Sequence, residues 1–381
     1  MTDDGARVVL LSLGLLLSSW STPLASQPTK TWSVSPEPDV EFGVVDGDPD
    51  YTFGKVRAAR FLPDGRIVVA DEDRPSIRVY GVDGEFRAEM GGEGEGPGEF
   101  ESIFGMWVRG PDTIRVWDNR TLRVTTFLGD GSLVGTREVR PDARSAPHGV
   151  LDVPAGEFSD GDVALAWTVG NLSGSGGYHA DRIVFGRFGP KGELKHLLGE
   201  GRGLLRSRSP VLFTPYPYAT VHQDSVYFTD GVGGRIIVLG PAGGGVARTL
   251  KLPASGTDAS EAWSALETEL RDDGEEATLR MLRSRPRAER TPALGGLLVD
   301  DRGFVWAKIY DPTSDPIYLD ARPWGGGGTW WVATPEGEPV ARVPMPDRVA
   351  PLDIEGDRLL GLRRGPLDAA QIVVHTLDRG R

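Results

Sequence analysis

The chain has 381 residues and a formal net charge of −13, so it carries too few cations for a nucleic-acid binder, whose affinity depends on lysine and arginine neutralising phosphates. It contains no cysteine, which excludes disulfides, thiolate metal sites and cysteine catalysis. The 52 glycines and 29 prolines exceed average usage and indicate many turns between short strands.

The N-terminal segment has the pattern of a secretory signal peptide. Residues 8–20 are an apolar run, followed by six mostly small residues that end at Ser26. A run this short cannot span a bilayer of about 30 Å as a helix, but it fits the apolar region of a leader. We therefore expect cleavage of residues 1–26 and an exported mature protein, periplasmic or extracellular, with no membrane span. A retained anchor and a buried N-terminal helix are the alternatives.

Short strands separated by tight turns follow the leader. Residues 31–42 contain two prolines, which an edge strand tolerates and a central strand does not. Residues 67–70 and 77–80 are runs of strand length rich in β-branched side chains, and the Asp-Gly pair at 83–84 is typical of a hairpin. A lone meander of this kind cannot bury both faces, so it needs similar neighbours.

The same unit recurs along the chain. Its second strands start 47, 49, 63, 78 and 55 residues apart, at Ile67, Ile114, Val163, Val226, Phe304 and Leu359. A second register places glycine in the hairpin after the third strand, at Gly84, Gly131, Gly192, Gly243 and Gly337. Periods of about 45 to 50 residues with four strands each are typical of a β-propeller. We predict an all-β fold, a single six-bladed β-propeller of four-stranded antiparallel blades over residues 27–381.

Two further predictions concern the two ends of the chain and the longest interval between repeats. The sixth unit stops after residues 371–377 and lacks a fourth strand, whereas residues 31–42 are a spare one. Pairing the two would complete blade 6 and hide two strand edges. Residues 257–290 contain a helical pattern that begins at Asp258 and Glu261, followed by a second helix. We expect a helical insert between blades 4 and 5.

This repeat resembles a known family. A strand, an aspartate, a short loop, another strand and an Asp-Gly hairpin recur, together with the glycine-rich turn at residues 94–100. The pattern resembles the NHL-repeat-like group of exported bacterial six-bladed β-propellers over roughly residues 31–378. The resemblance implies a fold and a binding role, and it names no reaction.

One end of the propeller is predicted to carry the binding face. The turns at the other end are short, while the extra length falls in loops such as residues 170–181, 199–217 and 310–328. Function usually lies on loops that a rigid scaffold holds in place. Loops that have lengthened without a function are the alternative.

Aromatic and histidine side chains at that end are the candidate ligand-binding residues. Aromatic rings suit recognition of a sugar, a peptide or a protein. The candidates are His148, Tyr178, His179, Tyr216, Tyr218 and Trp324. Packing between blades is the alternative role of the aromatic members.

We predict no cofactor, with Ca²⁺ and Zn²⁺ as the alternatives. Asp71, Asp118 and Asp230 follow second strands in one register, and three carboxylates around an axis could bind Ca²⁺. Capping of a local turn by each aspartate is the simpler interpretation. The five histidines show no pair at metal-ligand spacing, so a zinc site has little support.

These observations favour a monomeric binding or scaffolding module that recognises a protein, peptide or carbohydrate through its long-loop face. We expect a binding protein rather than an enzyme. The alternative is a metal-assisted lyase or hydrolase with its site at the mouth of the central channel, and a purely structural envelope protein is a third class.

Overall fold

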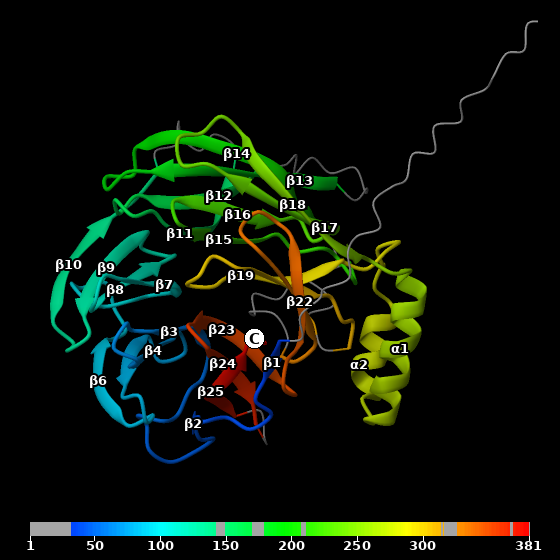
Figure 1. The fold of residues 1–381 in the computed structure, drawn as a ribbon, viewed down its shortest axis with the longest axis horizontal. Coiled ribbons are helices and arrows are strands. Elements are labelled where there is room, and N and C mark those ends of the chain that lie inside the picture. Colours follow the sequence, from blue (N-terminus) through cyan, green and yellow to red (C-terminus); the bar gives the residue numbers. More distant parts are fainter. Residues whose placement is uncertain are drawn as a thin grey trace, which may run out of the picture.

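The structure, a computed structural model, describes residues 32–141, 149–169, 179–206, 211–313, 315, 326–365 and 369–380. In these residues, six antiparallel sheets surround a central axis (Figure 1). The fold is the six-bladed β-propeller predicted from the repeat. The second strands begin within one residue of the predicted positions.

The first three blades are four-stranded meanders. Blade 1 contains β3 (Val56–Phe61), β4 (Ile67–Asp71), β5 (Ser76–Tyr80) and β6 (Phe86–Gly91). Blade 2 contains β7 (Ile103–Arg109), β8 (Thr113–Asp118), β9 (Arg123–Leu128) and β10 (Leu133–Glu138). Blade 3 contains β11 (Gly149–Glu157), β12 (Val163–Val169), β13 (His179–Phe188) and β14 (Leu194–Arg206).

The last three blades complete the ring. Blade 4 contains β15 (Tyr218–His222), β16 (Ser225–Thr229), β17 (Gly233–Leu239) and β18 (Val246–Ser255). Blade 5 contains β19 (Leu294–Val299), β20 (Val305–Ile309), β21 (Thr329–Ala333) and β22 (Pro339–Pro344). Blade 6 contains β23 (Val349–Glu355), β24 (Arg358–Arg364) and β25 (Ala370–Asp378), with β1 (Ser33–Val34) and β2 (Val40–Phe42) at its outer edge.

Burial explains why these segments form strands. Every residue of β4 and β5 is buried, because both faces of a middle strand pack against neighbouring blades, whereas the outer strand β6 is mostly accessible. The inner strands β3, β7, β11, β15, β19 and β23 contact one another in a closed ring. The predicted hairpin glycines all have positive φ, between 79° and 99°, a conformation that glycine adopts without strain.

The N-terminal segment supplies the outer edge of blade 6. Ser33 and Val34 pair with the end of β25, and β2 pairs with its middle, so the edge strand is in two pieces. The two prolines lie in the break between these pieces. The Ser35 amide donates to the Thr376 carbonyl at 2.9 Å, which continues the ladder into the break.

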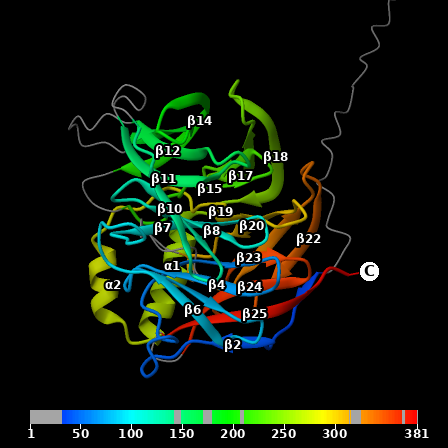
Figure 2. The ribbon, with the colours of Figure 1, turned by 90° about the vertical axis from the view of Figure 1, so that its left-hand side faces the viewer.

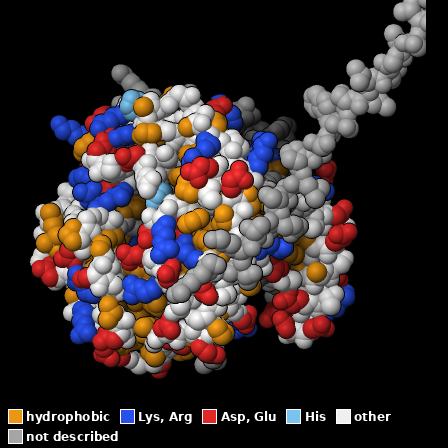
Figure 3. All heavy atoms as spheres, in the orientation of Figure 1, with side chains coloured by type: hydrophobic (Ala, Val, Ile, Leu, Met, Phe, Trp, Pro, Cys, Tyr) orange, Lys and Arg blue, Asp and Glu red, His pale blue; other side chains and the backbone are white. Residues whose placement is uncertain are grey.

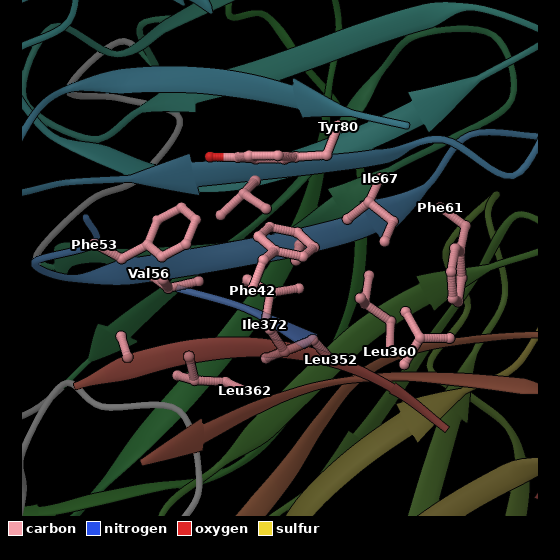
Figure 4. Packing of buried hydrophobic residues seen from close by; sticks show 14 residues of the cluster. Phe42, Phe53, Val56, Phe61, Ile67, Tyr80, Leu352, Leu360, Leu362 and Ile372 are labelled. Carbon is pink, nitrogen blue, oxygen red and sulfur yellow. The ribbon is translucent and has the colours of Figure 1, made fainter. Parts of the chain in front are cut away.

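Two aromatic residues of this segment fill the wedges on either side of blade 6. Phe42 packs between blades 6 and 1, with its ring centroid 4.3 Å from that of Tyr80 (Figure 4). Trp32 is buried between blades 5 and 6, where its ring lies 5.2 Å from Phe304. The chain ends are therefore tied to the ring by packing as well as by strand pairing.

The helical insert joins β18 to β19, between blades 4 and 5. It consists of α1 (Ala259–Asp272) and α2 (Glu276–Arg283), and Asp258 caps α1 by accepting from the Ser260 amide. Figure 2 shows both helices on the side of the ring opposite to the C-terminal end of β25. Among the described residues, neither helix is long and apolar enough to cross a membrane.

Candidate functional site

The described loops are longer at one end of the ring than at the other. At one end, turns of two to five residues join first to second strands. At the other end, where first strands begin and second strands finish, lie the helical insert and the connectors that lead to β7, β15 and β21. This long-loop face is the one that the sequence indicated, and it holds an unusual group of buried and half-buried polar side chains between blades 4 and 5.

A buried ion pair forms the floor of this group. Lys308, near the end of β20, and Asp315, in the loop that follows, are both buried, with the ammonium nitrogen 2.5 Å from Oδ1. The other carboxylate oxygen of Asp315 accepts from the Asp311 amide at 2.9 Å. Burial raises the pKa of Asp315 to about 6, although the Lys308 ammonium acts to lower it.

A bulge in the inner strand makes room for Asp315. The register between β19 and β20 shifts at Gly295, so this glycine is an extra residue in β19. A Cβ atom at Gly295 would lie 2.6 Å from Oδ2 of Asp315, so any other residue there would force the carboxylate to move. Bulges commonly redirect side chains beside functional sites. Here the bulge lets a loop carboxylate reach the inner strand.

Two half-buried tyrosines, Tyr218 and Tyr310, lie near the ion pair, and a third, Tyr216, packs against Tyr218. Tyr218 is the first residue of β15, and its ring centroid lies 5.0 Å from that of Tyr216 in the preceding connector. Tyr310 follows β20, and its amide donates to the Ala293 carbonyl at 3.2 Å. Burial raises the pKa of the Tyr218 hydroxyl well above its ordinary value, and the charge of Asp315 adds to this effect. We call Tyr216, Tyr218, Lys308, Tyr310, Asp311 and Asp315 the tyrosine–aspartate cluster.

The helical insert packs beside this cluster. Trp263 and Leu266 of α1 are buried against Leu212 and Phe213 of the connector before β15, and Tyr310 packs against the same apolar group. Phe213 is fully buried with a φ of 60°, in the left-handed region that a bulky residue rarely adopts. Packing against the insert therefore fixes the path of the connector that leads to Tyr216 and Tyr218.

Three arginines at and after the C-terminal end of α2 have partners within the protein. The Arg287 guanidinium lies 3.8 Å from the centre of the Trp263 ring, and Arg283 pairs with Glu267 at 2.6 Å. Arg290 donates to the Gly256 carbonyl. These side chains hold the insert together.

Of the predicted ligand-binding residues, the structure brings Tyr216 and Tyr218 together. His148, Tyr178 and Trp324 lie outside the described residues, and so does the side chain of His179, whose backbone begins β13. Asp315 was not among the residues predicted from the sequence. The one signal for it was Lys308, a lysine at a register position that holds aspartate in blades 1, 2 and 4.

The candidate calcium ligands accept hydrogen bonds from backbone amides of their own turns, and Asp71 and Asp118 also from the preceding connectors. Asp71 accepts from the amides of Gly54 and Lys55 and pairs with buried Arg78 at 2.9 Å. Both carboxylate oxygens of Asp118 likewise accept backbone amides, and Asp230 accepts from the Val232 amide. Within the described ranges, no three His, Asp or Glu side chains gather as a metal site would require.

The short-turn end carries a different charged group, which joins two blades. Glu157, at the end of β11, is buried and accepts from Arg115 at 2.7 Å and from Arg137 at 3.2 Å. Arg109 lies 3.3 Å from the same carboxylate, so three arginines of blade 2 hold one glutamate of blade 3. Figure 3 views this end and shows basic and acidic side chains intermixed over it. The Glu157 group is therefore a contact between blades 2 and 3.

Comparison of the sequence with protein-family models gives no match, and comparison with curated proteins gives none either. Many solved structures do match in three dimensions. A member of the DUF4221 family from Bacteroides vulgatus has a TM-score of 0.53 at 8% identity, over 92% of this chain and 99% of that chain. A Bacteroides fragilis protein described as exported has a TM-score of 0.49 at 10% identity, over 93% of this chain and 97% of that chain. A virginiamycin B lyase from Staphylococcus aureus has a TM-score of 0.39 at 12% identity, over 89% and 98%. These similarities concern the propeller fold alone.

Proposed function

We propose that the protein is an exported, monomeric binding module that holds its ligand on the long-loop face, at the tyrosine–aspartate cluster. Export rests on the leader-like residues 1–26. The observation that supports the binding role is the group of three half-buried tyrosines, two of which lie near the buried Lys308–Asp315 pair. Aromatic rings with a few fixed polar groups are the usual lining of a ligand site.

The ion pair supports a binding role because it lies at the end of β20 and in the loop that follows, on the long-loop face, beside Tyr218 and Tyr310. Burying two charges costs several kcal/mol per ion before their mutual attraction offsets it, and an apolar pair often stabilises a core as well. Buried charges of this kind concentrate at functional sites. The alternative, a metal-assisted lyase or hydrolase, would need ligands beyond the described residues, among which no metal-binding group of three side chains occurs.

Arrays of short peptides and of oligosaccharides, probed with the mature protein, test the proposal. We expect ligands that bind the wild type to bind the Tyr216→Ala/Tyr218→Ala variant at least about tenfold more weakly, as for loss of a central aromatic anchor. Tyr51→Ala is the matched control, since Tyr51 is also half-buried but packs against Phe42 at the edge of blade 6. Equal binding by the double variant, or no ligand on either array, would refute the proposal.

A further inference from the structure

We propose that the short-turn end carries a second binding site, in which Arg109, Arg115 and Arg137 bind an oxyanion of the phosphate or sulfate class. This site lies at the opposite end of the ring from the tyrosine–aspartate cluster and does not depend on the role proposed for that cluster. Three observations support it: three guanidinium groups contact one carboxylate, their side chains are exposed, and one buried donor lacks an acceptor within the described residues.

The three arginines converge because they share one face of blade 2. Arg109 ends β7, Arg115 lies in β8 and Arg137 lies in β10. The pairing registers of β7 to β10 place the three side chains on the same side of the sheet. On that side, Nη1 of Arg115 and Nη2 of Arg137 lie 2.7 and 3.2 Å from Oε1 of Glu157. Nε of Arg109 lies 3.3 Å from Oε2 of the same residue.

Glu157 balances only one of these three positive charges. The two carboxylates of the turn after β11 have cations of their own: Asp162 lies 2.7 Å from both Arg187 and Lys195, and Asp160 lies 2.5 Å from Arg187. A single arginine can bind a carboxylate through two parallel hydrogen bonds, so a contact between blades does not need three. Cations therefore exceed carboxylates here: Arg109, Arg115, Arg137, Arg187 and Lys195 face Glu157, Asp160, Asp162 and Asp224.

Arg137 shows the effect of this excess. Burial lowers the pKa of its guanidinium, and Glu157 opposes this effect while the nearby Arg115 adds to it. Its Nη2 donates to Glu157 and to the Gly161 carbonyl, whereas its Nη1 is buried without an acceptor in the described part of the chain. A buried donor without an acceptor is destabilising, and an oxyanion bound beside Arg137 would supply one.

The site is open to solvent on the side of the arginines. The side chains of Arg109, Arg115 and Arg137 are 37%, 28% and 27% exposed, whereas the side chain of Glu157 has no exposed surface. An anion that approaches from solvent therefore meets guanidinium groups before the carboxylate. Gly161 has a φ of 88°, and a Cβ atom there would lie 3.4 Å from Nη1 of Arg115. The turn beside this guanidinium thus has no side chain to cover it.

The chemistry of guanidinium groups indicates the class of ligand. Their planar forks of N–H donors match the oxygens of phosphate and sulfate groups. The two positive charges that Glu157 leaves unbalanced favour a doubly charged anion over a single carboxylate. A nucleic acid, with its row of phosphates, is disfavoured by the net charge of −13, so the expected ligand carries an isolated group.

Isothermal titration calorimetry of the mature protein with inorganic phosphate, sulfate and acetate, at pH 7.5 and matched ionic strength, tests this site. We expect phosphate or sulfate to bind, and the Arg115→Gln/Arg137→Gln variant to bind at least about tenfold more weakly, because hydrogen bonds between charged groups are strong. Arg123→Gln is the matched control and should change nothing, since Arg123 also lies in blade 2 but donates to the Glu95 carbonyl.

A second variant tests the site with the opposite sign. Glu157→Gln should bind the anion about threefold or more tightly, because a repelling charge is lost. Gln keeps an oxygen that can accept from Arg115 and Arg137, so this variant is expected to fold. If the double variant does not fold by circular dichroism, Glu157→Gln decides the test.

The nature of the anion follows from titration with glucose 6-phosphate and glucose 6-sulfate. Tighter binding of one of them assigns a phosphate or a sulfate group, and either result supports the inference. Absence of binding of both inorganic dianions to the wild type would overturn it. Equal affinity for acetate, equal binding by the folded double variant, or weaker binding by Glu157→Gln would also overturn it, and none of these results bears on the tyrosine–aspartate cluster.

Discussion

His375 shows how one buried side chain links the two ends of the chain. It lies in β25 with no exposed surface, and its Nδ1 is 2.8 Å from the Ser35 carbonyl, at the break in the edge strand. We take Nδ1 to carry the proton, because a carbonyl can only accept. Burial lowers the pKa of His375, and the nearby Arg363 acts in the same direction while Asp39 opposes it.

From the lowered pKa of His375 we predict that the protein loses stability in mild acid. The folded-state pKa lies below the unfolded value of about 6.5, so the unfolded chain binds more protons as the pH falls through that value, and the free energy of unfolding decreases. We expect the free energy of unfolding, measured by urea denaturation, to change less between pH 7.5 and pH 5 in the His375→Asn variant than in the wild type. The Asn amide can still donate to Ser35. His196→Asn, at an exposed site, should keep the full difference. A variant that loses as much stability in acid as the wild type would contradict this role.

The contacts of some single residues can be predicted from the local sequence, and those of others cannot. Asp71 accepts from amides 16 and 17 residues away and from its own turn, and a recurring aspartate after a strand indicates such capping. Asp315 is different, because its partner is fixed only when the loop folds back onto a bulge in β19. No spacing of residues in the sequence indicates that this loop folds back to bring Asp315 to Lys308. Tyr216 and Tyr218 were recognisable as candidates by type and position, whereas the approach of Tyr218 and Tyr310 to Asp315 required the structure.

At the scale of elements, the outer strand of blade 6 is the critical piece. The repeat revealed a missing strand at one end of the chain and a spare one at the other, and β1 and β2 pair with β25 accordingly. Its break at the two prolines follows from the same sequence, since proline cannot donate to a ladder. The packing of Trp32 against Phe304 was not predictable, because it depends on how two blades splay apart.

Deletion of residues 27–42 is therefore expected to destabilise the whole ring. It removes two buried aromatic side chains, each worth about 3 to 5 kcal/mol in a core, from a total stability of about 5 to 15 kcal/mol. The thermal midpoint should fall by about 10 °C or more, measured by circular dichroism. A deletion restricted to residues 27–31 is the control and should leave the midpoint unchanged. An equal midpoint for both deletions would show that the edge strand does not hold the ring closed.

At the scale of the whole molecule, the two ends of the ring differ in how their charges are used. At the short-turn end, charged side chains form ion pairs between blades, as Glu157 does with its three arginines. The long-loop end gathers carboxylates and tyrosines between blades 4 and 5, beside the helical insert. Loop lengths in the sequence indicated which end carries the long loops, but neither this difference in charge nor the position of the site around the ring followed from them.

The most direct test of the ligand face is a crystal structure of the mature protein soaked with a mixture of small aromatic, amine and saccharide fragments. We predict that bound fragments gather against Tyr216, Tyr218 and Tyr310 on the long-loop face. Fragments that bind only at the short-turn end, or that leave these three rings empty, would contradict the account.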